Sequence, residues 1–184
     1  MSEESASLIL KTHDLTLNTS NAIGTADQFG TSFTWNTINL RVLMGDLYDR
    51  YDRFNLCLNT IATTTLAAGT FAANDDRCLY VTIGGLPWIN NTYSQRYNTN
   101  QSDTVIASFY YTPNAQTTQY YYGNNIATFK KGSGVHNISI NFIKILDGTR
   151  PVPTGNLPAL IFMFDIVGVE EYKIKDVTES RIIK

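Results

Sequence analysis

The chain has 184 residues, of which 43% are hydrophobic and 16% charged, and its formal net charge is −2. This length predicts one domain that buries its core without needing disulfides or metal ions. Charged residues are scarcer than the usual ~25%, and the balanced charge excludes the strongly basic surface with which proteins bind nucleic acid or anionic membranes. Weak self-repulsion instead permits close packing against identical neighbours.

The first part of the chain predicts short strands separated by a loop. Residues 1–7 are polar and are expected to form a flexible arm. Apolar residues alternate with polar ones over 7–12, 14–18 and 32–38, as in strands that turn one face toward a core. Residues 21–31 contain two glycines and are expected to form a loop.

Residues 40–58, LRVLMGDLYDRYDRFNLCL, carry an unusual density of charge for this chain. Asn39 is a suitable N-cap, and apolar residues at helical spacing predict one short inserted helix near 40–52. These residues are Leu40, Leu43, Met44, Leu47 and Tyr51. Opposite charges four residues apart, Asp46 with Arg50 and Asp49 with Arg53, are expected on the exposed face of this helix, where each pair contributes about 0.3–0.5 kcal/mol. From Phe54 onward the apolar residues alternate, so a strand follows.

The remainder of the chain predicts further strands joined by polar loops. Strands are expected over 78–86, 104–111, 136–146 and 159–169, with a hairpin over 118–134. The apolar phase shifts at Phe142 and Ile143, which indicates either a bulge or burial of both faces of that strand. The strand at 159–169 is apolar on both faces and is expected to be central and covered on both sides.

This succession of strands predicts an all-β fold, an antiparallel two-sheet sandwich of the single jelly-roll type. The domain is expected to span residues 8–172 and to be followed by a charged segment, residues 173–184. Helical segments do not alternate with strands, which argues against an α/β fold.

The N-terminus and the cysteines indicate a protein made in the cytoplasm. The first residues, MSEESASLIL, lack the basic region and long apolar run of a signal peptide. No apolar run approaches the ~20 residues of a membrane-spanning helix. Cys57 and Cys78 are fewer than a secreted disulfide scaffold carries, and both are expected to be buried, reduced thiols.

The sequence offers little that suggests catalysis. No spacing of Cys and His fits a zinc site, and no nucleophile-elbow, dinucleotide-binding or phosphate-loop motif occurs. Paired carboxylates would be needed for a glycosidase, but Asp75 and Asp76 resemble a polar turn, and Glu170 and Glu171, adjacent on a strand, would point to opposite faces. Asp165 interrupts an apolar strand and is expected to make a structural hydrogen bond. We therefore expect no enzyme, with no catalytic residue, cofactor or metal.

Aromatic residues in the polar stretch after residue 86 suggest two kinds of binding. Trp88, Tyr93 and Tyr97 would suit stacking on sugar rings in a carbohydrate-binding β-sandwich. Tyr and Trp equally supply rigid contact area at protein interfaces, and the cytosolic character of the chain favours that second interpretation.

Two stretches, FTWNTINLRVLMGDLYDRYDRFNLCLNTIATTTL at 33–66 and CLYVTIGGLPW at 78–88, resemble small single jelly-roll capsid proteins of large icosahedral double-stranded DNA viruses, of the chlorella-virus type. The similarity extends to chain length, strand order, the early helix and the late hydrophobic strand. It implies a virion structural protein without catalysis. The expected role is a penton subunit that forms a homopentamer at the fivefold vertex; the alternative is a minor capsid or cement protein beneath the major capsid shell.

The resemblance also implies partners and a location. The partners would be further copies of the chain, the major capsid protein and other minor capsid proteins, with no direct contact to nucleic acid. The protein would be made in the host cytoplasm and reside in the capsid. The chain is long enough for one jelly roll, whereas the main shell subunits carry two, which argues against the major capsid protein.

The charge run and the aromatic residues then predict the subunit interface. Alternating signs allow an aspartate of one copy to face an arginine of the next, which fixes register more than it adds affinity. The alternative, that these charges only pair within their own helix, stays open. The expected interface residues are Asp49, Arg50, Asp52, Arg53, Trp88, Tyr93 and Tyr97.

Overall fold

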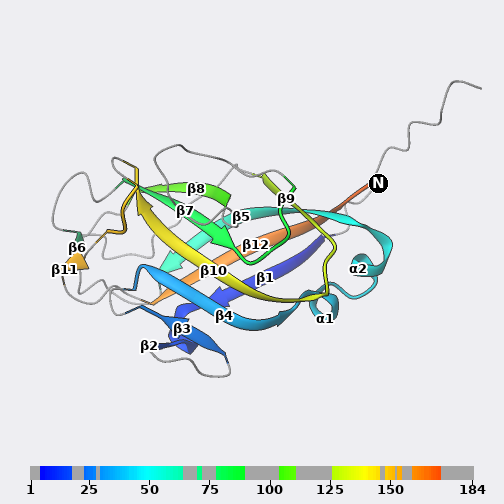
Figure 1. Cartoon of the computed structure of the whole chain (residues 1–184), viewed down its shortest axis with the longest axis horizontal. Helices are drawn as coiled ribbons and strands as arrows, with labels where there is room; N and C mark the ends of the chain where they lie inside the picture. Colours follow the sequence, from blue (N-terminus) through cyan, green and yellow to red (C-terminus); the bar gives the residue numbers. More distant parts are fainter. Residues whose placement is uncertain are drawn as a thin grey trace, which may run out of the picture.

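The computed structural model describes residues 5–17, 23–27, 30–63, 70–71, 78–89, 104–110, 126–145, 148–151, 153–154 and 159–170. Two sheets pack face to face, and two short helices lie at one end of the molecule (Figure 1). The predicted all-β sandwich is therefore confirmed.

One sheet has four strands, which are antiparallel to their neighbours. In spatial order they are β1 (Ser5–Lys11), β12 (Leu160–Val169), β5 (Arg53–Thr63) and β9 (Ile126–Lys130). β12 thus lies inside its sheet, as its hydrophobicity predicted. Its inward residues are buried, but Ile161, Met163 and Val167 on the outward face remain half-buried, so the expected cover on both sides is not complete.

The other sheet has six strands and carries the second half of the core. In spatial order they are β2 (Thr16–Leu17), β3 (Gly24–Ala26), β4 (Ser32–Asn39), β10 (Val135–Lys144), β7 (Cys78–Gly84) and β8 (Thr104–Tyr110). β2 and β3 pair in parallel, and the other neighbours are antiparallel. A separate small ladder joins β6 (Thr70–Phe71) to β11 (Pro153–Thr154).

The eight longer strands follow the order of a jelly roll. Numbered along the chain, the first, eighth, third and sixth form one sheet, as β1-β12-β5-β9. The second, seventh, fourth and fifth form the other, as β4-β10-β7-β8. The chain crosses repeatedly between the sheets, which is the double Greek-key pattern of this architecture.

Aromatic rings join the two sheets in the core. Phe162 of β12 lies with its ring centroid 6.0 Å from that of Phe33, 6.2 Å from that of Trp35 and 6.1 Å from that of Phe142. Phe33 and Trp35 are inward residues of β4 and Phe142 is an inward residue of β10, so this cluster connects facing sheets. Tilted and edge-on arrangements at these distances are favourable for aromatic pairs.

The expected single helix near 40–52 is instead two, α1 (Leu40–Met44) and α2 (Asp46–Arg50). Gly45 separates them with φ +54°, a conformation that residues with a Cβ rarely adopt. Despite this break, most of the predicted apolar stripe faces the core: Leu40, Met44 and Leu47 are buried, and Tyr51 packs against the core. Only Leu43 departs from the prediction, with 41% of its surface exposed, and Tyr48, which was not expected in the stripe, is also buried.

Other boundaries differ from the sequence-based expectations. β1 begins at Ser5, within the range expected to be a flexible arm, because Ser5 pairs with Val167. A short 3-10 turn, η1 (Thr12–Asp14), occupies the start of the second predicted strand. Phe142 and Ile143 are both buried, so both faces of β10 are covered there. The segment 173–184 lies outside the described residues.

Asp165 does have structural partners. It sits on the outward face of β12, where Asn59 and Ser7 from the two neighbouring strands donate hydrogen bonds to its carboxylate. Asn59 is available because the register between β12 and β5 shifts between Met163 and Phe164, which leaves this residue as the extra one on β5. Cys57 lies opposite Asp165 and is half-buried and free of a disulfide; burial and, second, the nearby carboxylate raise the pKa of its thiol. The side chain of Cys78 lies outside the described part of the structure.

Candidate functional site

Four segments meet at one end of the sandwich, which we call the helical end: α1, α2, residues 84–89 and residues 131–134 (right-hand side of Figure 1). Two hydrogen bonds, one from a side-chain cap and one between main chains, fix the start of α1. The Asn39 side chain caps it by accepting from the Val42 amide at 3.1 Å, and the Leu40 amide donates to the Gly134 carbonyl at 2.7 Å. The predicted N-cap is thus confirmed, and the helix is joined to the 131–134 loop.

The 131–134 loop is held on its other sides by main-chain hydrogen bonds. The Lys131 amide donates to the Asp52 carbonyl at 2.7 Å, and the Lys130 amide donates to the Pro87 carbonyl at 2.9 Å. The Ile89 amide donates to the Thr128 carbonyl at 2.8 Å. Residues 87–89 therefore cover the outer edge of β9, where an open edge would invite strand addition.

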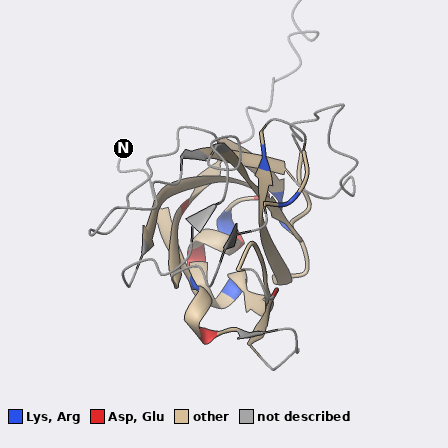
Figure 2. Cartoon of the chain, turned by 90° about the vertical axis from the view of Figure 1, so that its left-hand side faces the viewer, with Lys and Arg blue, Asp and Glu red and all other residues tan. Residues whose placement is uncertain are grey.

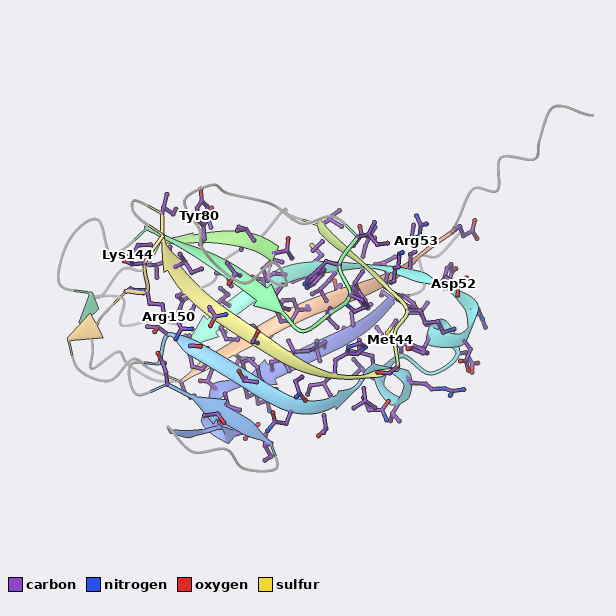
Figure 3. The ribbon with its side chains drawn as sticks, in the orientation of Figure 1. Met44, Asp52, Arg53, Tyr80, Lys144 and Arg150 are labelled. Carbon is purple, nitrogen blue, oxygen red and sulfur yellow. The ribbon has the colours of Figure 1, made fainter. Side chains whose placement is uncertain are left out.

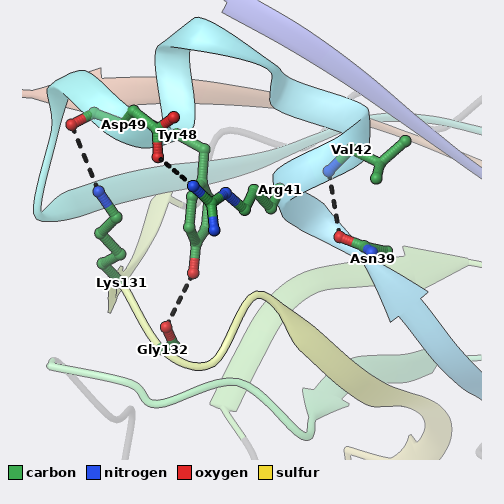
Figure 4. A network of polar contacts seen from close by, with 7 residues as sticks. All are labelled: Asn39, Arg41, Val42, Tyr48, Asp49, Lys131 and Gly132. Atoms are coloured by element: carbon green, nitrogen blue, oxygen red, sulfur yellow. Dashed lines mark hydrogen bonds and ion pairs between the residues drawn. The ribbon is translucent and has the colours of Figure 1, made fainter.

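A small polar network lies on the surface of this end (Figure 4). Arg41 of α1 approaches the Asp49 carboxylate of α2 at 3.5 Å, and both side chains are largely exposed. The Lys131 ammonium lies 3.4 Å from the Asp49 carbonyl and 5.0 Å from the centre of the Tyr48 ring. Exposed ion pairs contribute little stability. The network's main effect is to hold charges of both signs in defined positions on the surface.

A row of contacting aromatic rings packs beneath α2 and joins it to the core. Tyr48 stacks on Phe54 with ring centroids 5.8 Å apart, Phe54 contacts Phe129 at 5.5 Å, and Trp88 meets Phe129 edge-on at 6.0 Å. Burial raises the pKa of Tyr48, although the nearby Arg41 guanidinium acts in the opposite direction. The hydroxyl thus stays protonated and donates to Gly132 at 2.8 Å.

Replacing Tyr48 by phenylalanine is expected to lower the free energy of unfolding by about 1 kcal/mol. The ring would keep its stacking on Phe54, but the Gly132 carbonyl would lose its hydrogen bond. Urea denaturation of both proteins measures the difference. Tyr51→Phe is the control, since Tyr51 is also a partly buried tyrosine at this end; an equal loss in both variants would contradict a specific role for the Tyr48 hydroxyl.

An apolar patch lies beside the polar network. Val42 is 78% exposed, Leu43 41% and Val135 46%. Val135 and Val42 are close because Asn39 pairs with Val135 across the ladder and also accepts from the Val42 amide. Three large apolar side chains exposed together are less common than single ones and are typical of contact surfaces.

The structure places most of the predicted interface residues at this end. Asp49, Arg50 and Asp52 are exposed, and Arg53 is half-buried at the start of β5. Asp52 and Arg53 lie beside α2, whereas Lys144 and Arg150 lie at the opposite end (Figure 3). Asp49, expected to pair with Arg53, is instead in contact with Arg41.

The predicted aromatic residues are placed only in part. Trp88 is partly buried against the core, and its indole Nε1 is buried without a hydrogen-bond partner among the described residues. Tyr93 and Tyr97 lie outside the described residues. Sequence reasoning missed Val42, Val135 and Lys131, which no local pattern in the sequence marks as surface contacts.

The residues that could bind a metal ion do not gather in the described part of the chain. Within the residues that the structure covers, no three His, Cys, Asp or Glu side chains converge as metal ligands would. Glu170 is exposed at the end of β12, while Asp75, Asp76 and Glu171 lie outside the described residues. Charged residues are sparse over the ribbon (Figure 2). In the described part of the chain, no helix has the length and hydrophobicity needed to cross a membrane.

Comparisons with family models, with curated proteins and with solved structures each found no match to this chain. These comparisons therefore identify no family for the chain.

Proposed function

We propose that the protein is a virion structural protein, a penton subunit at the fivefold vertices of a large icosahedral DNA virus, and that its helical end is a contact between copies. The observation that carries this proposal is the exposed apolar patch of Val42, Leu43 and Val135, bordered by fixed charges of both signs, on a jelly-roll sandwich. Jelly rolls are a recurrent architecture of viral capsids and lectins. Fold alone does not set function, so the proposal depends on the surface of the helical end.

The composition of the helical end suits recognition of another protein. Protein interfaces combine an apolar centre with a polar rim, and charges at the rim select the partner and its orientation. Here Val42 and Leu43 supply apolar area on a short helix that is anchored at its N-terminus, so little ordering is needed on contact. Arg41 and Asp49 supply one cation and one anion in fixed positions.

A second copy of the chain is the partner that we propose for this surface. A surface with both signs can meet its counterpart on an identical subunit with opposite charges aligned. The low overall charge leaves little repulsion between copies. A minor capsid protein would use the same surface against the major capsid protein; the two roles differ in whether the isolated chain self-associates.

The carbohydrate-binding alternative is less well supported by the described residues. A sugar platform needs an exposed aromatic face, but Trp88 is partly buried and meets Phe129 edge-on. One of the three residues proposed for that function therefore contributes to the core.

Replacing Val42 by glutamate is expected to convert a pentamer into monomers while leaving the unfolding temperature nearly unchanged. Val42 is 78% exposed, so the monomer loses almost no buried area, whereas a contact between copies would have to bury a charge. Native mass spectrometry and sedimentation velocity measure the assembly state, and thermal denaturation measures the fold.

Ile126→Glu is the matched control, because Ile126 is 56% exposed at the start of β9, away from the helical end. The proposed contact predicts that this variant assembles like the parent protein. Dissociation of both variants would show that the contact is not confined to the helical end, and a parent protein that is monomeric at all concentrations would contradict the penton proposal.

A further inference from the structure

His136 connects two of the segments that form the helical end. It lies near the start of β10, and its Nδ1 is 3.2 Å from the Gly85 carbonyl oxygen, which follows β7. A carbonyl oxygen only accepts, so Nδ1 must carry the proton. In the neutral ring, Nε2 is then the unprotonated nitrogen.

The surroundings of Nε2 disfavour its protonation. It is buried and has no hydrogen-bond partner among the residues that the structure describes. A Cβ at Gly132 would lie 2.9 Å from the ring carbon Cε1 and 3.2 Å from Nε2, so the loop backbone closely covers this edge of the ring. Protonation would create a buried N–H donor, with a positive charge, facing this backbone.

The charged groups around the helical end do not compensate for such a charge. Residues 84–89 and β4 contain no titratable side chain, and Cys78 and Tyr80 of β7 lie toward the other end of that strand. A protonated His136 would add a positive charge to those of Arg41 and Lys131. The Asp49 carboxylate is already paired with Arg41. The remaining titratable groups on α2, on β9 and in the two residues between α2 and β5 are Asp46, Tyr48, Arg50, Tyr51, Asp52 and Lys130.

The loop that covers His136 also positions the helices. Gly132 accepts from the Tyr48 hydroxyl, and Gly134 accepts from the Leu40 amide, so displacement of the loop would loosen both α1 and α2. The exposed patch around Val42 depends on α1 being held. A change at His136 is thus transmitted to the proposed contact surface through two hydrogen bonds.

We propose that His136 is an acid-sensitive latch: protonation at Nε2 releases the 131–134 loop, loosens α1 and α2, and weakens the contact between copies. The latch itself depends only on the fold, whereas its effect on assembly rests on the proposed function.

The direction of the pH effect follows from the neutral ring. Burial lowers the pKa of His136, and the hydrogen bond to Gly85 only partly offsets it. In the opened or unfolded chain the pKa returns to about 6.5. The stabilisation is therefore complete above about pH 6.5 and is lost as the pH falls through the lowered pKa of the closed form.

Hydrogen exchange with mass spectrometry at pH 7.5 and 5.0 tests the latch. The chain has two histidines, so His13→Gln leaves His136 as the one that can titrate. In that protein, opening in peptides covering 40–50 and 131–136 is expected to increase toward tenfold for each pH unit below about 6.5. His136→Gln measured at the same pH values corrects for the intrinsic pH dependence of exchange and should show no such increase.

A second measurement keeps the test decisive if His136→Gln is unstable. The ring signals of the single histidine in the His13→Gln protein can be followed by NMR across the same pH range. A pKa at or above 6.5, or equal opening at both pH values after correction for intrinsic exchange, would overturn the latch.

Native mass spectrometry of the same proteins at both pH values separates the two proposals. Dissociation at pH 5.0 in His13→Gln but not in His136→Gln would support a latch that acts on the contact between copies. If the chain is monomeric at pH 7.5 while the exchange effect is present, the proposed function fails and the latch stands. An assembly that stays intact at pH 5.0 despite local opening would overturn the claimed effect on the contact.

Discussion

Replacing Phe162 by alanine is expected to lower the free energy of unfolding by about 3–5 kcal/mol. Phe162 is fully buried in β12, and its ring contacts Phe33, Trp35 and Phe142 of the facing sheet. The substitution removes apolar area and leaves a cavity that both rigid sheets border, so little collapse can fill it. Urea denaturation followed by tryptophan fluorescence measures the loss, because Trp35 reports on this cluster.

Ile9→Ala is the matched control for the Phe162 variant. Ile9 also lies in the four-stranded sheet but is 52% exposed on its outward face, so the expected loss is below about 1 kcal/mol. A similar loss in both variants would show that the aromatic cluster does not join the two sheets as the geometry indicates.

Replacing Gly85 by alanine is expected to destabilise the fold by about 3 kcal/mol or more, from backbone strain and a collision together. Gly85 has φ +89°, and a Cβ there would lie 1.7 Å from the Asn137 carbonyl oxygen of β10. Neither atom can move without displacing the end of β7 or the start of β10. Thermal and chemical denaturation measure the effect, and the Gly85 carbonyl contact to His136 would be lost with it.

Gly45→Ala separates strain from collision. Gly45 also has a positive φ, +54°, but a Cβ there would meet no atom within 4 Å. Its expected cost is therefore the conformational strain alone, about 1–2 kcal/mol. If the two variants lost equal stability, the close approach of Gly85 to Asn137 would not be the cause.

The sequence predicted burial best where the local pattern of apolar residues determines which way a side chain points. Alternation placed Leu8, Leu10, Phe33 and Trp35 on inward faces, because strand geometry sends every second side chain to the same side. The shift at Phe142 was also interpreted correctly by one of its two alternatives, since both faces are buried there. A succession of strands with one helical interruption led to the prediction of a jelly-roll sandwich.

Sequence reasoning was weaker where contacts span distant segments. Asp49 was assigned to Arg53 by helical spacing, but α2 ends at Arg50 and Arg53 begins β5, so the two side chains are not one helical turn apart, and Asp49 contacts Arg41 instead. Asp165 was expected to make a structural hydrogen bond, but its partner Asn59 is brought to it by a register shift that the sequence does not reveal. In both cases, the partner comes from an element that spacing along the sequence does not indicate.

By itself, the amino-acid sequence determined the fold class, most of the longer strands and the place where helical structure interrupts them, because periodicity and turn residues act over a few positions. It did not reveal β3, which lies within the predicted loop 21–31. Only the tertiary structure decided that the 131–134 loop, residues 84–89 and the two helices form one surface, and that His136 lies closed beneath that loop. These segments are far apart along the chain. Their meeting depends on how the sheets pair and pack, which local pattern does not encode.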